Sequence, residues 1–311
     1  MSRAVMDAIV RVPVRRRARA PGTRPRHNVP MNASPSSATP FAPGTPRSAQ
    51  LSFSDQPAWI VADEVVGGWT LLIGGVEQSH VDLEDPTRLV HEYLRRMGNV
   101  LDQVRPAGAP LRIAHLGGGA LTLVRYVQAT RPGSAQLVIE IERELPTLVT
   151  TALPLPEGTE LEVVIGDARE ELAALGEREF DVIVLDVFSG QDSPAHLAEA
   201  AFYREALSHL GADGLLMVNV GDDAGQLFLA AQVRELEAAA AVVGVPGVWT
   251  LTDAQLLARP ADGNMVLLAG GALASPVVED WRAAWLAAGP HPAAVLDPHE
   301  TEEAVGRVGR S

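Results

Sequence analysis

The sequence predicts an α/β fold in which helices cover both faces of a mostly parallel sheet. Between about residues 111 and 241, apolar runs of strand length alternate with segments of helical periodicity, an order typical of βαβ units. Several of these runs end in glycine or an acidic residue, and ligands bind at that edge of such sheets. With 311 residues, 47% of them hydrophobic, the chain can bury a substantial core.

The expected elements of this domain follow one another at regular spacing. We expect strands at residues 111–116, 136–141, 161–165, 180–185 and 215–220. Helices are expected at residues 121–129, 143–152, 169–175, 195–210 and 225–241. Two late strands, residues 245–252 and 264–269, are joined through a loop with proline and glycine and should pair antiparallel.

A small β region precedes this domain. Two apolar runs, residues 58–66 and 69–75, flank Gly67-Gly68, which predicts a hairpin. A helix over residues 87–104 should follow, opened by Asp85-Pro86 as a cap and a residue whose φ already suits a helix. The expected organisation is a disordered tail at 1–50, the small β region at 51–86, the α/β domain at 87–285 and an irregular C-terminal tail at 286–311.

Charge is unevenly distributed along the chain. Residues 1–50 hold nine arginines and one acid, whereas residues 51–311 hold 16 arginines and 38 acids, so a +8 tail precedes a −22 body. The tail is rich in proline, serine and arginine, a composition typical of disorder. A basic arm for an acidic partner or an anionic membrane is one alternative, and a translation start at Met31 is another.

Composition excludes several classes of protein. The acidic body argues against nucleic-acid binding and leaves room for a cationic substrate. The absence of cysteine excludes disulfides, zinc-thiolate sites, iron–sulfur clusters and a thiol nucleophile. No run approaches the roughly 20 apolar residues that span a bilayer, and no apolar run follows the basic residues 11–26 as in a secretory signal. We therefore expect a cytoplasmic protein with no membrane or nucleic-acid partner and no metal.

Four polar features stand at the ends of predicted strands and should meet at one edge of the sheet. The first is the run Gly117, Gly118 and Gly119, which lets the backbone approach a ligand, although the dinucleotide fingerprint is incomplete and a plain turn is the alternative. The second is Glu140, about 20 residues further on, where a carboxylate meets ribose hydroxyls. The neighbouring Glu142 is the alternative for this role, but as the next acid at the strand end it is expected to face solvent.

The other two features are aspartates. Asp167 could accept a hydrogen bond from an adenine amino group or cap the helix at 169–175, and the two roles are compatible because a cap can use one oxygen. Asp186 ends a strand expected to be buried on both faces, where a carboxylate is costly unless it is used or paired. Capping or turn formation is the alternative for Asp186, because Ser189-Gly190 follows.

The order of these motifs resembles that of a known family. Gly-Gly-Gly, Glu140-Ile141-Glu142, Gly166-Asp167, the run Phe180 to Asp186, Phe202-Tyr203 and Asp213-Gly214 resemble segments of the spermidine/spermine synthases. These polyamine aminopropyltransferases have the Rossmann-like fold of class I S-adenosylmethionine-dependent methyltransferases. The resemblance covers about residues 58–270.

The resemblance implies a co-substrate, decarboxylated S-adenosylmethionine, rather than a permanently bound cofactor, and an amine acceptor. Residues implied to contact the donor are Gln78, Gly117, Gly118, Gly119, Glu140, Asp167 and Ala168. Asp186 matches the catalytic aspartate that takes a proton from the amine, and His91 lies near the same cleft. Homodimers or homotetramers are implied as well.

Departures from the family pattern fall on the amine side. Ala120 and Ser189 stand where the family has aspartates, Val90 stands where it has a tyrosine, and residues 251–263 lack its Tyr-Pro segment. Asp192 is a candidate to compensate, since it lies in the loop after Asp186, and the candidate residues for binding the amine are His91, Ser189 and Asp192. Such losses should weaken the binding of a cationic amine.

Three functions follow. The first is aminopropyl transfer to an amine, with an altered acceptor or reduced activity. The second is methyl transfer from intact S-adenosylmethionine, because Ala120 removes the acid that meets the aminopropyl ammonium. The third is a non-catalytic nucleoside-binding or scaffold protein.

Overall fold

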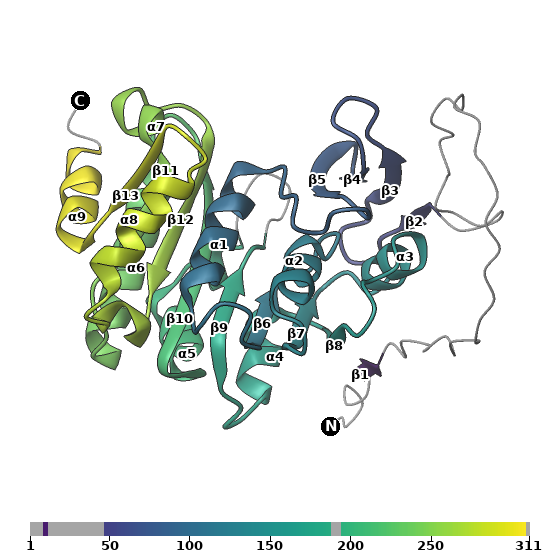
Figure 1. Cartoon of the computed structure of the whole chain (residues 1–311), viewed down its shortest axis with the longest axis horizontal. Coiled ribbons are helices and arrows are strands. Elements are labelled where there is room, and N and C mark those ends of the chain that lie inside the picture. The colour runs from purple at the N-terminus through teal and green to yellow at the C-terminus, as the bar shows by residue number, and fades with distance from the viewer. Residues whose placement is uncertain (1–8, 12–46, 188–193, 309–311) are drawn as a thin grey trace, which may run out of the picture.

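The computed structural model describes residues 9–11, 47–187 and 194–308, and it contains two sheets (Figure 1). A nine-stranded sheet with helices on both faces forms the body, and a four-stranded antiparallel sheet stands beside it. The predicted fold class, α/β with a small β region before it, is confirmed.

Strand order in the large sheet is β1-β8-β7-β6-β9-β10-β12-β11-β13. The parallel centre consists of β8 (Glu160–Ile165), β7 (Ala135–Glu140), β6 (Arg112–Leu116), β9 (Phe180–Leu185) and β10 (Leu210–Asp222). The other four strands each pair antiparallel with the strands beside them. On the β10 side they are β12 (Gly263–Ala269), β11 (Trp249–Asp253) and β13 (Ala293–Leu296), and on the β8 side it is β1 (Ile9–Arg11). The predicted antiparallel pairing of the two late strands is confirmed. Since β12 opposes both β10 and β11, these two run in the same direction.

The helices form two layers, one on each face of this sheet. Their bounds are α1 (Glu92–Gln103), α2 (Thr122–Thr130), α3 (Leu145–Ala152), α4 (Ala168–Ala174), α5 (Ala200–Ser208), α6 (Leu227–Val243), α7 (Ala254–Ala258), α8 (Val278–Ala288) and α9 (Pro298–Arg307). Alternate residues of β9 face opposite layers: Val182 and Val184 pack with α1, α2 and α8, whereas Ile183 and Leu185 pack with α4, α5 and α6.

The small sheet contains more than the predicted hairpin. β3 (Pro57–Ala62) and β4 (Trp69–Ile73) pair across the double glycine as expected, and β2 (Ser48–Gln50) and β5 (Val76–Val81) extend them on either side. Its inner side shares a core with α2 and α3, where Ile60 and Leu71 meet Leu121 and Val149. This sheet therefore packs on the helices next to the carboxyl edge of the large sheet (Figure 1).

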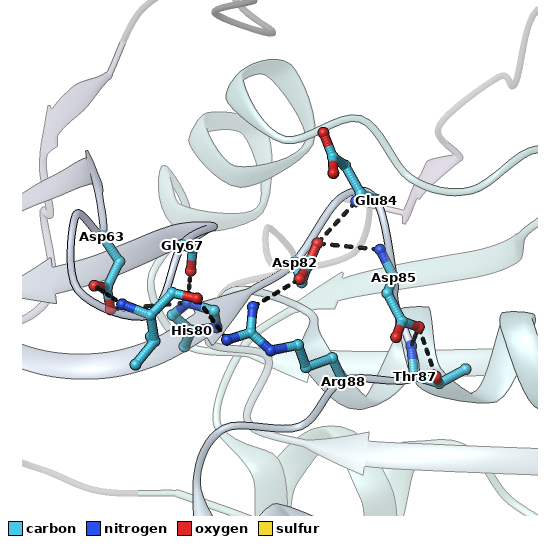
Figure 2. Close-up of polar contacts among 9 residues, drawn as sticks. Asp63, Gly67, His80, Asp82, Glu84, Asp85, Thr87 and Arg88 are labelled. Atoms are coloured by element: carbon cyan, nitrogen blue, oxygen red, sulfur yellow. Dashed lines mark hydrogen bonds and ion pairs between the residues drawn. The ribbon is translucent and has the colours of Figure 1, made fainter. Parts of the chain in front are cut away.

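Polar contacts fix the path from this small sheet toward α1 (Figure 2). A ring nitrogen of the buried His80 lies 2.6 Å from the carbonyl oxygen of Gly67, and the Arg88 guanidinium donates to Asp82 at 2.9 Å. The carboxylate of Asp63 accepts from the backbone of Val65 and Val66 in the same turn.

The predicted start of the first helix is wrong. Asp85 accepts bonds from the backbone and hydroxyl of Thr87, so it stabilises a separate turn, and α1 begins only at Glu92. An aspartate before a proline suits a turn as well as a helix cap, which is why the sequence misplaced the boundary.

Both ends of the chain also differ from expectation. The C-terminal segment 286–311, predicted to be irregular, contains β13 and α9, and α9 begins with a capping box formed by Asp297 and Glu300. The four residues of β13 are too few for a periodic pattern of apolar residues to be recognised. Within the predicted tail, β1 and β2 are strands, while residues 1–8 and 12–46 lie outside the described residues.

Residues 211–214, which separate the predicted helix at 195–210 from the predicted strand at 215–220, lie inside β10, where its pairing with β9 shifts register. In the described ranges, every helix is too short or too polar to cross a lipid bilayer.

Candidate active site

The carboxyl ends of β6, β7, β8 and β9 meet at one edge of the sheet and bring the four predicted features together. In the parallel ladders, Leu116 pairs with both Ile139 and Leu185, and Glu140 pairs with Ile165. The residues that follow these strands therefore share one edge, as the topology predicted.

The glycine run adopts a backbone that side chains would obstruct. Gly117 has φ +92°, and a Cβ there would lie 2.2 Å from the carbonyl oxygen of Asp186. Gly119 has φ +49°, and a Cβ there would lie 2.6 Å from Ser79 Oγ, which also accepts from the backbone of Ala120 at 3.2 Å. The run passes closely between β5 and the end of β9, so glycine is required at both positions.

Glu140 lies beneath this run and is buried. Its Oε2 accepts from the Gly118 backbone and its Oε1 from the Glu142 backbone, both at 2.9 Å. Burial raises the pKa of Glu140, and these backbone N–H groups act in the opposite direction. A carboxylate has about four acceptor sites, so these bonds do not exhaust its capacity to bind a ligand.

Glu142 does not face solvent, so that expectation is wrong. It is only 6% exposed, and its carboxylate accepts from the backbones of Phe53 at 3.1 Å and Ser54 at 2.9 Å. Those donors lie 88 and 89 residues away in sequence, so only the docking of the small sheet brings them there.

Asp167 caps α4 with one oxygen, and the other oxygen faces a histidine. Oδ1 accepts from the backbones of Arg169 at 2.9 Å and Glu170 at 3.2 Å, and Oδ2 lies 2.7 Å from His196 Nε2. Burial raises the pKa of Asp167, but the hydrogen bonds of His196, Glu170 and Arg169 outweigh it and hold the pKa below its usual value. Ala168, buried beside it, is the first residue of α4.

Asp186 accepts one hydrogen bond on each oxygen. The Tyr93 hydroxyl donates to Oδ2 at 3.2 Å, and Asn219 Nδ2 donates to Oδ1 at 2.8 Å. Asn264 Nδ2 in turn donates to Asn219 Oδ1 at 3.1 Å. Burial raises the pKa of Asp186, while the bonds from Asn219 and Tyr93 and the charge of His91 act in the opposite direction.

Four predicted residues remain. Two of them, His91 and Gln78, lie near this edge of the sheet, and the other two fall in a segment that the structure does not describe. His91 precedes α1, with Nε2 3.2 Å from Glu77 Oε1, and Gln78 is half-buried on β5. Ser189 and Asp192 lie outside the described residues.

Sequence reasoning missed His196, the two donors to Asp186 (Tyr93 and Asn219), and Asn264, which bonds Asn219. A signal existed for Asn219, which is a polar residue inside the apolar strand run at 215–220. Alternation along β9 and β10 places Asn219 and Asp186 on the same face of the sheet. Tyr93 falls within the predicted helix at 87–104, and no local pattern indicates that its hydroxyl reaches a residue 93 positions away.

Comparisons with known proteins support the resemblance. No protein-family profile matches the chain. Polyamine aminopropyltransferases of two Neisseria meningitidis strains are 28% identical over 155 residues, which is 49% of this chain and 58% of theirs. The match thus spans little more than half the length of these curated relatives.

Solved structures match over more of the chain. The crystal structure of a probable spermidine synthase from Corynebacterium glutamicum has a TM-score of 0.71 and 25% identity, covering 84% of this chain and 94% of that one. Spermidine synthase in complex with AdoDATO has a TM-score of 0.55 at 16% identity, covering 83% of this chain and 86% of that one, and shares the fold.

The parallel strands β8 to β10, with β12 inserted antiparallel before β11, define a Rossmann-like protein of the class I methyltransferase type. Within that class the chain is similar in sequence to polyamine aminopropyltransferases and in fold to a probable spermidine synthase.

Proposed function

We propose that this chain transfers an aminopropyl group from decarboxylated S-adenosylmethionine to an amine. The observation that carries the proposal is the environment of Asp186. Its two hydrogen-bond donors in the described part of the chain, a phenol and an amide, are neutral, so neither of them compensates the negative charge that the carboxylate can offer to a cationic acceptor.

Asp181 shows the contrast. That aspartate, at the other end of β9, binds the guanidinium groups of Arg105 at 2.9 Å and Arg112 at 3.4 Å. Its charge is compensated within the protein, as in a structural ion pair. Within the described residues, the hydrogen-bond partners of Asp186 include no guanidinium group, so we take its charge to be available to a ligand.

The donor half of the site is proposed from the glycine run and two carboxylates. Glu140 would bind the ribose hydroxyls, and Asp167 the adenine amino group, beside Ala168. The backbone at Gly117–Gly119 would lie against the nucleoside, and Gln78 would line the cleft from β5. The unused lone pairs of Glu140, and the neighbouring position of the α4 N-terminus, support this arrangement.

The reaction follows from these positions. The lone pair of the amine nitrogen attacks the methylene carbon next to the sulfonium, and the carbon–sulfur bond breaks with its electron pair staying on sulfur. Methylthioadenosine leaves as a neutral thioether, and Asp186 takes the proton lost by the amine. In-line positioning and one base supply the catalysis, and no covalent intermediate is needed.

One observation favours a second candidate, methyl transfer from S-adenosylmethionine. Ala120, where the family has an acid, is fully buried, and its backbone binds Ser79 of the small sheet. That position therefore offers no carboxylate to the ammonium of an aminopropyl group, and the choice of donor could relax.

A paired assay distinguishes these functions. The purified full chain is incubated with decarboxylated S-adenosylmethionine and putrescine or longer amines, and separately with S-adenosylmethionine, while methylthioadenosine and S-adenosylhomocysteine are measured. We expect methylthioadenosine alone, reduced about 100-fold or more by Asp186→Asn, as for loss of a general base. S-adenosylhomocysteine would support methyl transfer instead. Nucleoside binding by calorimetry without either product would support the non-catalytic alternative.

The proposed partners are therefore the nucleoside donor and the amine. A homodimer or homotetramer is proposed by resemblance alone, and sedimentation of the full chain tests it.

A further inference from the structure

We propose that Tyr93 and Asn219, the latter oriented by Asn264, are positioning residues that aim the Asp186 carboxylate and keep it ionised for the acceptor. The inference rests on the proposed function, because it concerns how the base of that reaction is prepared. It also revises the view from sequence that the amine side of the site has simply been lost.

The three strand residues reach the same place through the register of the sheet. Asp186 directly follows β9, Asn219 lies on the parallel neighbour β10, and Asn264 lies on β12 opposite Gly221. Asn264 is therefore two residues diagonal to Asn219 across the antiparallel pair, within reach for long side chains. Alternation puts Asp186, Asn219 and Asn264 on the face of the sheet that α1 covers.

Asn264 decides which end of the Asn219 amide meets the carboxylate. Asn219 is 3% exposed, so its amide must satisfy its hydrogen bonds inside the protein. The Asn264 N–H holds the Asn219 carbonyl oxygen, which leaves the Asn219 N–H group to point at Asp186. Removal of Asn264 takes away the donor that holds the Asn219 oxygen, so the amide is less firmly oriented toward the carboxylate, which itself accepts only from the N–H end.

Tyr93 approaches from α1, the helix that covers this face of the sheet. A carboxylate can only accept, so the hydroxyl must donate its proton to Oδ2. Burial and the charge of Asp186 raise the pKa of Tyr93, which keeps this hydroxyl protonated. Val90 occupies the position of the family tyrosine in this chain. The hydroxyl that contacts Asp186 belongs instead to Tyr93, three residues further along.

The two donors oppose the effect of burial on Asp186. Each bond stabilises the ionised carboxylate, so the loss of either should make the carboxyl easier to protonate and less effective as a base. The titratable groups that face Asp186 in the described part of the chain are Tyr93 and His91, and Glu77 pairs with His91 behind it. These groups remain when Asn219 is changed, so its effect can be isolated.

The test measures the titration of Asp186 directly in the full chain. Carboxyl carbons are labelled with ¹³C, the Asp186 signal is assigned by its loss in Asp186→Asn, and its midpoint is followed in Tyr93→Phe, Asn219→Leu and Asn264→Ala. We expect the midpoint to rise by about one pH unit when either donor is lost, and by less in Asn264→Ala.

Tyr126→Phe is the matched control. Tyr126 also donates to an aspartate, Asp102, at 3.0 Å, but from α2 to the far end of α1. This variant removes an equivalent hydroxyl and should leave the Asp186 midpoint unchanged. An equal rise in Tyr126→Phe would mean that the shift reflects general loosening and would overturn the proposal.

A second readout is the acidic limb of the kcat/KM profile for amine transfer. It should move to higher pH by the same amount as the midpoint, while the affinity for methylthioadenosine stays within twofold of wild type. Unchanged midpoints in both Tyr93→Phe and Asn219→Leu, with native circular dichroism, would overturn the inference even if transfer is observed. Shifted midpoints without transfer to any amine would support the positioning of Asp186 and reject the proposed function. If Asn219→Leu does not fold, Tyr93→Phe and Asn264→Ala carry the test.

Discussion

Chemically similar carboxylates have different roles in this protein because their hydrogen-bond and ion-pair partners differ. Asp181 is compensated by arginines, Asp167 is shared between a helix cap and His196, and Asp186 has a phenol and an amide. Glu140 is held entirely by backbone N–H groups. The partner, and not the residue type, separates a structural acid from a candidate catalytic one.

Glu140→Gln should weaken nucleoside binding. The amide retains one acceptor oxygen and the shape of the side chain, but it loses the charge that strengthens bonds to the ribose hydroxyls. Such bonds contribute about 1.5–3 kcal/mol, so we expect the Kd for methylthioadenosine to rise roughly 10- to 100-fold in calorimetry. Glu160→Gln, at the exposed start of β8, is the control. An unchanged Kd in Glu140→Gln would rule out the proposed ribose contact.

At the scale of elements, buried charge ties helices and strands together. The Arg125 guanidinium donates to the carbonyl oxygens of Ala120, Leu153 and Pro154, and so joins the glycine turn before α2 to the end of α3. Burial lowers the pKa of Arg125 to about 10, which still leaves it charged at neutral pH. The geometry of the glycine run thus depends on a residue outside it.

Arg125→Met should destabilise the fold. Methionine fills much of the volume but leaves three carbonyl groups without their donor, a loss of about 3 kcal/mol in the free energy of unfolding. Urea denaturation measures it, with Arg95→Met, on the exposed face of α1, as the control within about 0.5 kcal/mol of wild type. Equal stability of both variants would show that Arg125 is dispensable.

Asp181 joins the starts of β6 and β9, and its contribution should depend on pH. Burial raises the pKa of Asp181, but the Arg112 backbone and the Arg105 and Arg112 side chains outweigh it and hold the pKa below 3.8. The unfolded chain therefore binds the proton first as pH falls, and the stabilisation is complete above pH 3.8 and lost through the lower folded value.

We expect Asp181→Asn to cost about 2 kcal/mol at pH 7, measured by urea unfolding. The difference from wild type should shrink as the pH is lowered from 4 toward 2. A difference that stays constant over this range would show that the carboxylate charge contributes nothing.

At the scale of the whole molecule, the small sheet is part of the candidate site. It supplies Ser79 against the glycine run, Gln78 at the rim and Glu77 beside His91. The docking is held by the shared core with α2 and α3 and by Glu142, which accepts two backbone bonds from the segment after β2.

Glu142→Gln should loosen this docking without unfolding the α/β body. An amide has one acceptor oxygen where two N–H groups now bind a carboxylate, so one donor is left unpaired. We expect faster amide hydrogen exchange over residues 51–81 and unchanged protection in β6 and β9. Glu302→Gln, exposed on α9, is the control. Uniform loss of protection would instead indicate global destabilisation.

Much of this architecture could be predicted from the sequence. The periodicity from β6 to β10 was strong because each strand is apolar and each helix repeats on one face, and the four features at the strand ends came together as topology requires. The errors fell on weak local signals, such as the four residues of β13 and the Asp85 turn.

The fold class, the parallel centre of the sheet and the edge at which chemistry should occur can be predicted from the sequence, because they follow from the local order of apolar and polar residues. Which side chains meet at that edge depends on long-range packing. Tyr93 and Asp186 are 93 residues apart, Asn219 and Asp186 are 33 apart, and Glu142 and Phe53 are 89 apart. Such pairs carry no local pattern, since their contact arises from strand register and from the packing of α1 and the small sheet on the body.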